Sequence, residues 1–199
     1  HAKNIIFNDI KGIDASKPLL LWMPTLIKIK GEIIDNIKVW LPVMTKLLDK
    51  YNLLVRLHPK LVVLRPEMAD YLASFGLLVD VRKGRNLGVL YQSSDLVLAD
   101  YGGSVLSAVY MKKKLILLNS PSKKWIKWRE KRKYIDDDVR NDVSSFNLND
   151  GVALIEQIKN DIQNNDDTKI DMLKEKYFGN ECNHKEIKKI FFKLIETFA

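Results

Sequence analysis

A histidine beside an arginine and a glycine-rich turn are the two segments of this sequence best suited to chemistry. His58 follows Arg56-Leu57, and residues 100–104 read Asp-Tyr-Gly-Gly-Ser. Adjacent glycines let a backbone approach a ligand closely, and the free N–H groups at the start of a helix suit a phosphate. An imidazole can stabilise the charge that develops on a departing phosphate. The two segments therefore predict a phosphate site at which His58 is catalytic and Ser104 adds a hydroxyl.

Each segment also has a purely structural interpretation. Residues 100–104 could form a tight strand–helix turn capped by Ser104, and His58 could cap its own strand before Pro59. The glycine pair matches neither the phosphate loop with Gly-Lys-Ser/Thr nor the Gly-x-Gly-x-x-Gly fingerprint. Neither His58 nor His184 has ligand-type neighbours in the sequence, so we expect no metal site, and no cofactor is implied.

A third segment with chemical potential is the basic stretch from Lys123 to Lys133. Its two tryptophans lie three residues apart and share a face if the segment is helical. Lysines interleaved with tryptophans suit an anionic membrane surface or a polyanionic polymer. A solvated helix whose tryptophans pack on the domain fits the pattern too. No recognised nucleic-acid-binding motif is present, so we expect no nucleic-acid partner. The residues expected to contact a membrane or polymer are Lys123, Lys124, Trp125, Lys127 and Trp128.

The composition excludes several classes of protein. The 199 residues include 33 Lys and Arg against 25 Asp and Glu, and the net charge of +8 reflects either an AT-rich bacterial genome or an anionic partner. Apolar residues at 46% and charged residues at 29% exclude a mostly disordered chain. The single cysteine excludes an internal disulfide. No apolar stretch is long enough to span a membrane and none resembles a signal peptide, so we expect a cytoplasmic protein, peripheral on the inner face of the membrane if the basic segment binds lipid.

Short apolar runs alternate along the chain with segments of helical period. The runs expected as strands are 19–23, 52–57, 77–81, 95–99 and 114–118. The segments expected as helices between them are 33–50, 66–75, 87–93 and 103–110. Because the strand runs are continuously apolar, they indicate strands buried on both faces, as in a parallel sheet between helix layers. The predicted fold is an α/β, Rossmann-like, doubly wound parallel sheet.

This topology gathers the polar segments at one edge of the sheet. In open α/β sheets, ligands bind beyond the carboxyl ends of the strands. The segments that follow the predicted strands are polar, basic or glycine-containing, and this convergence predicts that the site lies at that edge. They are Pro24-Thr25, His58 to Lys60, Arg82 to Arg85, residues 100–104 and Asn119-Ser120.

The sequence resembles the C-terminal half of the CDP-glycerol glycerophosphotransferases, bacterial enzymes that build teichoic acids and related capsule polymers. The matching segments are Leu20 to Thr25, Val55 to Pro59, Ser94 to Tyr101 and Lys113 to Leu118, and the resemblance extends over residues 17–198. It implies the donor-binding half of a two-domain GT-B architecture. It also implies that a CDP-activated donor contacts Pro24, Thr25, Arg56, Leu57, His58, Gly102 and Gly103.

The sequence departs from the family's pattern at three places. Gly102-Gly103 stands where the family usually has Ser-Ser, Leu26-Ile27 where it usually has Phe-Arg, and Ser107 where it usually has an acidic residue. Loss of that carboxylate removes an acceptor for hydroxyl groups of the donor, so the departures bear on which donor is bound. The expected donor-binding set is completed by Asp100, Tyr101, Ser104 and Ser107.

The sequence supports three functional hypotheses. The first is a transferase that moves a glycerophosphate-like group from a CDP-activated donor to a hydroxyl of an anionic polymer or lipid-linked acceptor. The second is a GT-B glycosyltransferase or epimerase-like domain that uses a UDP-sugar, which the Gly-Gly-Ser turn motivates. The third is a non-catalytic module that binds an anionic membrane or polymer through residues 123–133. The first implies that an acceptor site and a second catalytic histidine lie in an N-terminal half outside this chain.

Three parts are expected along the chain. Residues 1–16 read as a linker or tag-derived segment, residues 17–162 as the Rossmann-like nucleotide-donor-binding domain, and residues 163–199 as C-terminal closing helices at 170–178 and 183–198. Within the domain, residues 134–149 are polar and loop-like with a short strand near Val143, and a helix follows over 150–162.

Overall fold

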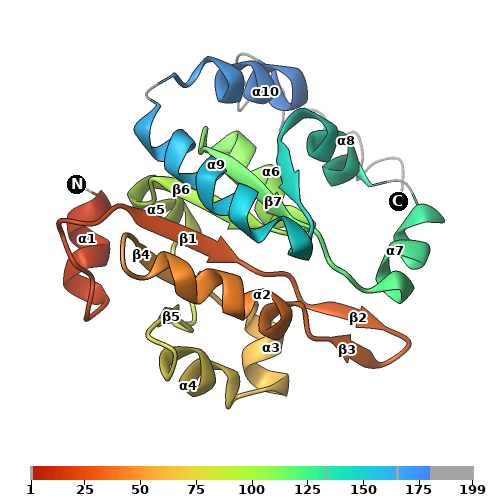
Figure 1. Ribbon diagram of the computed structural model, residues 1–199, viewed down its shortest axis with the longest axis horizontal. Coiled ribbons are helices and arrows are strands. Elements are labelled where there is room, and N and C mark those ends of the chain that lie inside the picture. Colours follow the sequence, from red (N-terminus) through yellow and green to blue (C-terminus); the bar gives the residue numbers. More distant parts are fainter. Residues whose placement is uncertain (1, 133, 165, 180–199) are drawn as a thin grey trace, which may run out of the picture.

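A computed structural model of the protein describes residues 2–132, 134–164 and 166–179. Within these residues the centre is a six-stranded parallel sheet in the order β5-β4-β1-β6-β7-β8 (Figure 1). Numbered by their appearance in the chain, these strands have the 3-2-1-4-5-6 order of the doubly wound Rossmann fold, which confirms the predicted fold class. The strands are β1 (Leu19–Met23), β4 (Asn52–Arg56), β5 (Leu78–Asp80), β6 (Leu96–Ala99), β7 (Leu115–Leu118) and β8 (Ser144–Phe146).

The central strands are buried on both faces, as their continuous apolar runs predict. Every residue of β1, β6 and β7 is buried. Alternate side chains of β1 point to opposite faces: Leu20 and Trp22 join one apolar cluster, and Leu19 and Leu21 join the other. The sheet therefore lies between two apolar layers and needs helices on both sides.

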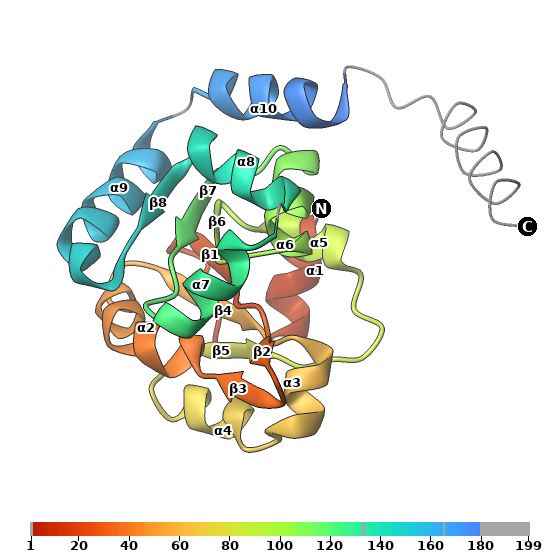
Figure 2. The same ribbon diagram turned by 90° about the vertical axis from the view of Figure 1, so that its right-hand side faces the viewer.

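Helices cover both faces of the sheet (Figures 1 and 2). The cluster that contains Trp22 includes side chains of α2 (Asn36–Met44), α3 (Pro59–Leu64), α4 (Met68–Ala73) and α9 (Gly151–Gln163). The cluster on the other face includes side chains of α1 (Ala2–Asp9), α5 (Leu87–Ser93), α6 (Gly103–Tyr110), α8 (Ile135–Asp142) and α10 (Thr168–Phe178).

The order of the strands places a crevice between β1 and β6. From β1 the chain builds outward to β4 and β5, and it then returns past β1 to build β6, β7 and β8 on the other side. Met23 at the end of β1 pairs with Ala99 at the end of β6, so residues 24–25 and 100–104 leave the sheet next to each other. This is the topological switch point at which open α/β sheets bind their ligands.

The N-terminal segment differs from the expected linker. Residues Ala2–Asp9 form α1, and Ile6 is fully buried in the apolar layer that also contains Leu90 of α5. Phe7 and Ile10 pack partly against the same layer. An eight-residue helix with only a few apolar positions is too short to show a clear period, which explains why the sequence pattern missed it.

The segment expected as a loop at residues 134–149 contains a helix followed by a strand. Three aspartates occupy the first turn of α8, where negative charge stabilises a helix by interaction with its dipole. Because aspartates are also common in loops, the same residues led to the prediction of a polar loop. The short strand predicted near Val143 is confirmed as β8.

A hairpin lies between β1 and α2, where the sequence pattern placed the beginning of a helix. It consists of β2 (Ile27–Ile29) and β3 (Glu32–Ile34), joined by Lys30 and Gly31 with φ of 49° and 89°. Two positive φ angles are typical of the tight turns that join hairpin strands. Helix α2 therefore begins only at Asn36, capped by Asp35, and the helix expected over 183–198 lies outside the described residues.

No helix in the described ranges is both long and apolar enough to cross a membrane.

We predict that α1 contributes to the stability of the domain. Ile6→Ala is expected to lower the free energy of unfolding by about 2–4 kcal/mol, because it leaves a cavity in a packed layer. Ile5 is the matched control: it is 42% exposed, and Ile5→Ala is expected to change stability by less than about 0.5 kcal/mol. Chemical denaturation of both variants measures the difference, and equally small effects would show that α1 is not part of the folded unit.

Candidate functional site

A cleft of about 590 Å³ opens at the carboxyl edge of the sheet, at the switch point. It collects nine of the eleven residues that the sequence predicted for the catalytic and donor-binding site, contributed by β4, α6 and the segments that follow β1, β4 and β6. These nine are Pro24, Thr25, Arg56, Leu57, His58, Gly102, Gly103, Ser104 and Ser107. Asp100 and Tyr101 do not line the cleft, and the structure places them behind it.

Asp100 has a structural position under the cleft. Its side chain is 1% exposed, and its carboxylate accepts hydrogen bonds from the N–H groups of Thr25 and Tyr101, each at 2.8 Å, and from Asn36 Nδ2 at 3.0 Å. Burial raises the pKa of this carboxyl, while the three hydrogen bonds act in the opposite direction. The group thus joins the ends of β1 and β6 to the first turn of α2.

Tyr101 is held just as firmly. Its hydroxyl accepts a hydrogen bond from the Ser120 N–H at 2.9 Å, and its carbonyl accepts one from Thr25 Oγ1 at 2.6 Å. The guanidinium groups of Arg129 and Arg140 lie 4.6 and 4.5 Å from the centre of its ring. Cations over an aromatic ring are attracted to its quadrupole, so both arginines help to hold this ring in place.

The glycine turn is shaped from behind by α8. Gly102 has φ of 75° and ψ of −147°, a backbone conformation that residues other than glycine rarely adopt. Its N–H donates to Asp136 Oδ2 at 3.0 Å, and the buried Asp136 also accepts from Arg129 Nη2 at 2.8 Å. The amide of Gly102 is therefore used within the protein and is not available to a ligand, although the sequence predicted that it would be.

The next two amides remain available at the start of α6. In the part of the chain that the structure describes, no acceptor is found for the N–H groups of Gly103 and Ser104. Both residues line the cleft. Two free amides at the N-terminus of a helix, together with the positive end of its dipole, favour an anionic oxygen.

His58 has a structural role, although it caps the helix that follows and not its own strand. It caps α3, since its Nδ1 accepts a hydrogen bond from the Lys60 N–H at 3.1 Å. An accepting Nδ1 places the proton of the neutral imidazole on Nε2, which is then a donor. Desolvation and the charge of Lys60 lower the pKa of His58, so near pH 7 it acts as a neutral donor rather than as an imidazolium.

Arg56 lies in an ionic cluster at the end of β4. Its Nη1 donates to Asp80 Oδ2 at 3.0 Å and to the carbonyls of Asp80 and Arg82 at 3.2 and 3.1 Å. Asp80 also binds Arg85, whose Nη2 lies 3.0 Å from Oδ1. Asp80 is buried, so this carboxylate fixes both guanidinium groups at the wall of the cleft.

The basic segment forms α7 (Lys123–Glu130), and only part of it faces outward. Trp125 is 7% exposed, stacks on Trp128 with ring centroids 5.1 Å apart and meets the edge of Tyr101 at 5.3 Å. The expected contact of Trp125 with a membrane or polymer does not fit this burial, because the ring packs against the domain. The lysines at 123, 124 and 127 are exposed, and Lys124 pairs with Glu32 of the hairpin.

Sequence reasoning missed several residues of the site. Arg85 and Tyr91 line the cleft, and the Tyr91 hydroxyl donates to the Ser104 carbonyl at 3.1 Å. The sequence placed Arg82 to Arg85 at the ligand edge of the sheet, but Arg85 was not part of the predicted donor-binding set. Asp136 gave no such signal, because its helix was read as a loop. No group of three or more metal-ligating side chains is arranged to hold a metal ion within the described ranges.

Comparison with known proteins identifies structural relatives but no relative in sequence. No family model matches the sequence, and no curated protein is significantly similar to it. Structures of the wall teichoic acid polymerase TagF match it with TM-scores of 0.62 and 0.60 at 16% and 19% identity; the first of them was soaked with CDPG. The catalytic domain of starch synthase IV from Arabidopsis thaliana, bound to ADP and acarbose, matches with a TM-score of 0.53 at 13% identity.

The fold is thus the Rossmann-like half of a GT-B architecture, as the sequence predicted. The match to TagF covers 98% of this chain but only 46% of that chain, so the protein spans about half the length of the structures it matches. At these identities the similarity establishes the fold, and it agrees with the resemblance that the motifs carry.

We predict that the conformation of Gly102 restricts it to glycine. Gly102→Ala is expected to lower the free energy of unfolding by about 1–3 kcal/mol, because alanine is strained at this φ and ψ even though no atom lies within 4 Å of the added methyl group. Gly103→Ala is the matched control: it also meets open space, and its helical backbone should leave stability unchanged or raised by up to about 1 kcal/mol. Urea denaturation of the two variants tests the pair, and equal stabilities would contradict the assigned turn.

Proposed function

We propose that the chain is the donor-binding half of a transferase that moves a glycerophosphate-like group from a CDP-activated donor to a hydroxyl of an anionic polymer or lipid-linked acceptor. The observation that carries the proposal is that His58, whose Nε2 is a donor, lines one cleft at the switch point with Gly103 and Ser104, whose amides lack an acceptor among the described residues. The likeness of the fold to TagF supports the same class of reaction.

The proposed reaction assigns a donor group to the negative charge of the leaving phosphate and a base to the proton of the acceptor. The acceptor oxygen attacks the phosphorus that carries the glycerol group, the bond from this phosphorus to the bridging oxygen breaks, and CMP departs with that oxygen and its electron pair. The amides of Gly103 and Ser104 and the His58 Nε2–H stabilise the charge on the departing phosphate. The proton of the acceptor hydroxyl goes to a base that we place in the partner half of the enzyme, outside this chain.

Arg56 and Pro24-Thr25 complete the donor site in this proposal. Arg56 supplies positive charge at the wall of the cleft and is held there by Asp80. Thr25 is fixed by its bonds to Asp100 and Tyr101, so the floor of the cleft is rigid before any ligand arrives. Leu57 and Ser107 line the same wall.

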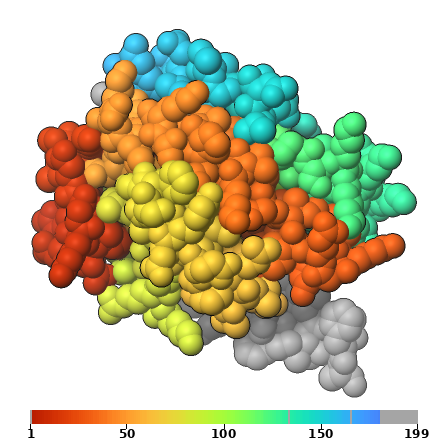
Figure 3. All heavy atoms as spheres, turned by 60° about the horizontal axis from the view of Figure 1, so that its bottom comes forward, coloured from red at the N-terminus to blue at the C-terminus, as the bar shows by residue number. Residues whose placement is uncertain are grey.

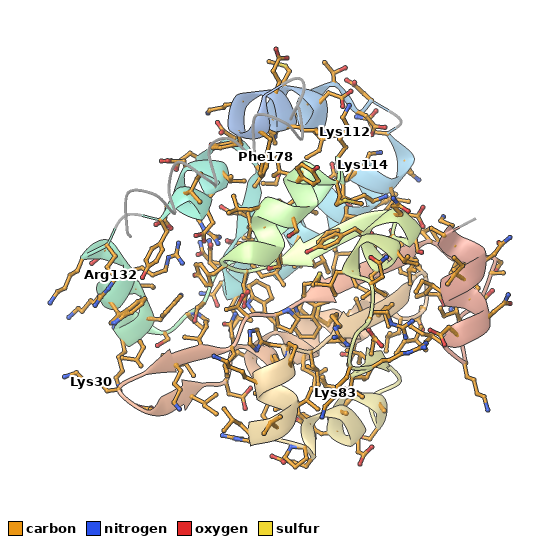
Figure 4. All side chains as sticks on the ribbon, turned by 180° about the vertical axis from the view of Figure 1, so that it is seen from behind. Lys30, Lys83, Lys112, Lys114, Arg132 and Phe178 are labelled. Carbon is orange, nitrogen blue, oxygen red and sulfur yellow. The ribbon has the colours of Figure 1, made fainter. Side chains whose placement is uncertain are left out.

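For the acceptor side, we propose that the exposed lysines of α7, together with Trp128, attract an anionic polymer or the anionic inner face of the cell membrane. Lys123 and Lys127 are exposed, and the hairpin and α7 lie next to each other on the same side of the molecule (Figures 1 and 3). Lys30 at the hairpin and Arg132 beyond α7 both project from that side (Figure 4). A peripheral position on the cytoplasmic face of the membrane follows from this proposal.

One observation favours a UDP-sugar as the alternative donor. Ser107 lines the cleft where the resembled family has a carboxylate, so this chain lacks that acceptor for donor hydroxyls. The starch synthase that shares the fold is a sugar transferase bound to ADP. The third hypothesis, a non-catalytic binding module, is less well supported, because Trp125 is buried and nine of the predicted catalytic and donor-binding residues line one cleft.

Calorimetric titration with CDP, CDP-glycerol, UDP and a UDP-sugar tests the proposal. We expect selective binding of the cytidine ligands and about a tenfold weaker affinity in His58→Asn, which corresponds to the loss of one hydrogen bond to a charged group. Asparagine is a good N-cap, so this variant keeps the cap of α3 while it removes the Nε2 donor.

The stability of the His58→Asn variant decides how a loss of nucleotide affinity is interpreted. His58→Asn should unfold at the same denaturant concentration as the wild type, so that weaker binding reports the missing donor and not a damaged fold. Selectivity for uridine ligands would move the assignment to a sugar nucleotide. Nucleotide binding that is equally strong in wild type and His58→Asn would contradict the role of His58.

A further inference from the structure

A second cavity lies beside the cleft, between α1 and the loop that joins β5 to α5. Its volume is about 560 Å³. Gly84 and Arg85 line both this cavity and the cleft, so one loop separates the two. Figure 3 shows α1 in red directly beside the yellow-green segment that contains this loop. Sequence reasoning did not predict this cavity, because its other wall is α1 and residues 1–16 were expected to be a linker.

The walls of this cavity are basic. Arg82, Lys83 and Arg85 contribute three cations, and Asp9 is the one carboxylate among its lining residues. Lys83, which Figure 4 labels, is exposed, while the Arg85 side chain is only 8% exposed. Arg85 cannot turn away, because its Nε and Nη2 both donate to Asp80. The cavity therefore contains one cation held in place by Asp80 and one exposed cation.

The pairing of these charges shows where an external anion would fit. Asp80 is a single carboxylate shared by Arg56 and Arg85, so it cannot neutralise both. The second anion is Asp9 of α1, which accepts a hydrogen bond from Arg85 and, at 2.9 and 3.0 Å, from Arg82. These contacts lower the pKa of Asp9. A side chain of α1 thus occupies the position at which a bound anion would meet two guanidinium groups.

We propose that this cavity is a second binding site, separate from the donor cleft, for the phosphate group of a small phosphorylated ligand. Guanidinium groups match the geometry of phosphate oxygens, and Arg82 and Arg85 already converge on one carboxylate. The phosphate takes the place of the Asp9 carboxylate, and Lys83 adds a third cation. Ile5 and Val89 give the organic part of the ligand an apolar wall.

An NMR titration of the chain with inorganic phosphate tests the proposal. The amides of Asn8 and Val89 report on the cavity, since both residues line it and neither lines the cleft. The amides of Gly103 and Ser104 report on the cleft. We expect phosphate to shift the Asn8 and Val89 signals, and R82Q/K83Q to weaken that binding about tenfold, as expected when charged hydrogen-bond donors are removed.

Two further variants distinguish binding of phosphate in the cavity from non-specific attraction of phosphate to a basic protein. K28Q/K30Q removes the same charge from the exposed hairpin and is expected to change the affinity less than about twofold, because exposed charges at a distance are screened. Asp9→Asn keeps the size of the side chain and removes the competing charge, so it should bind phosphate more tightly than the wild type.

Failure of the second site and failure of the proposed donor cleft give different results in these titrations. Phosphate shifts confined to Gly103 and Ser104, or equal weakening in R82Q/K83Q and K28Q/K30Q, would overturn the second site. Neither result bears on nucleotide selectivity, which the titrations with His58→Asn test. Unchanged CDP affinity in R82Q/K83Q, together with about tenfold weaker phosphate binding in the cavity, is the result expected for two separate sites.

Discussion

The carboxylate of Asp100 holds the two sides of the switch point together, and the geometry of the cleft depends on it. It lies where β1 and β6 end. It accepts hydrogen bonds from the backbone N–H groups of Thr25 and Tyr101, each the second residue after its strand, and from the side-chain amide of Asn36. A buried carboxylate is stable only when such donors surround it. The same bonds therefore stabilise the charge and fix the backbone that forms the floor of the cleft.

A second layer of buried charge holds the glycine turn at the start of α6. Asp136 of α8 binds the Gly102 N–H and Arg129, and Arg129 and Arg140 enclose the Tyr101 ring. Gly103 and Ser104, whose N–H groups have no acceptor in the described part of the chain, line the cleft together with His58. Helix α8 and the basic helix α7 thus act on the site through contacts behind it, and α7 is anchored there by the packing of Trp125 on Tyr101.

The sequence was sufficient to predict the parallel sheet, because β1, β6 and β7 are continuous apolar runs with no polar residue among them. It also located the cleft, since the strand ends of a Rossmann fold converge by topology. It could not show that Asp136 takes the Gly102 amide, because that contact joins residues 34 positions apart through a helix whose aspartates resemble a loop. The docking of α1 was hidden for a similar reason: its burial rests mainly on Ile6.

The central claim is that the free amides of α6 and the Nε2 of His58 bind the phosphates of a nucleotide donor. A crystal structure of the chain with CDP tests it most directly. The account predicts phosphate oxygens within hydrogen-bond distance of the Gly103 and Ser104 amides and of His58 Nε2, with Gly102 still bound to Asp136. A nucleotide whose phosphates lie away from α6, or a turn that releases Gly102 from Asp136 to bind them, would contradict it.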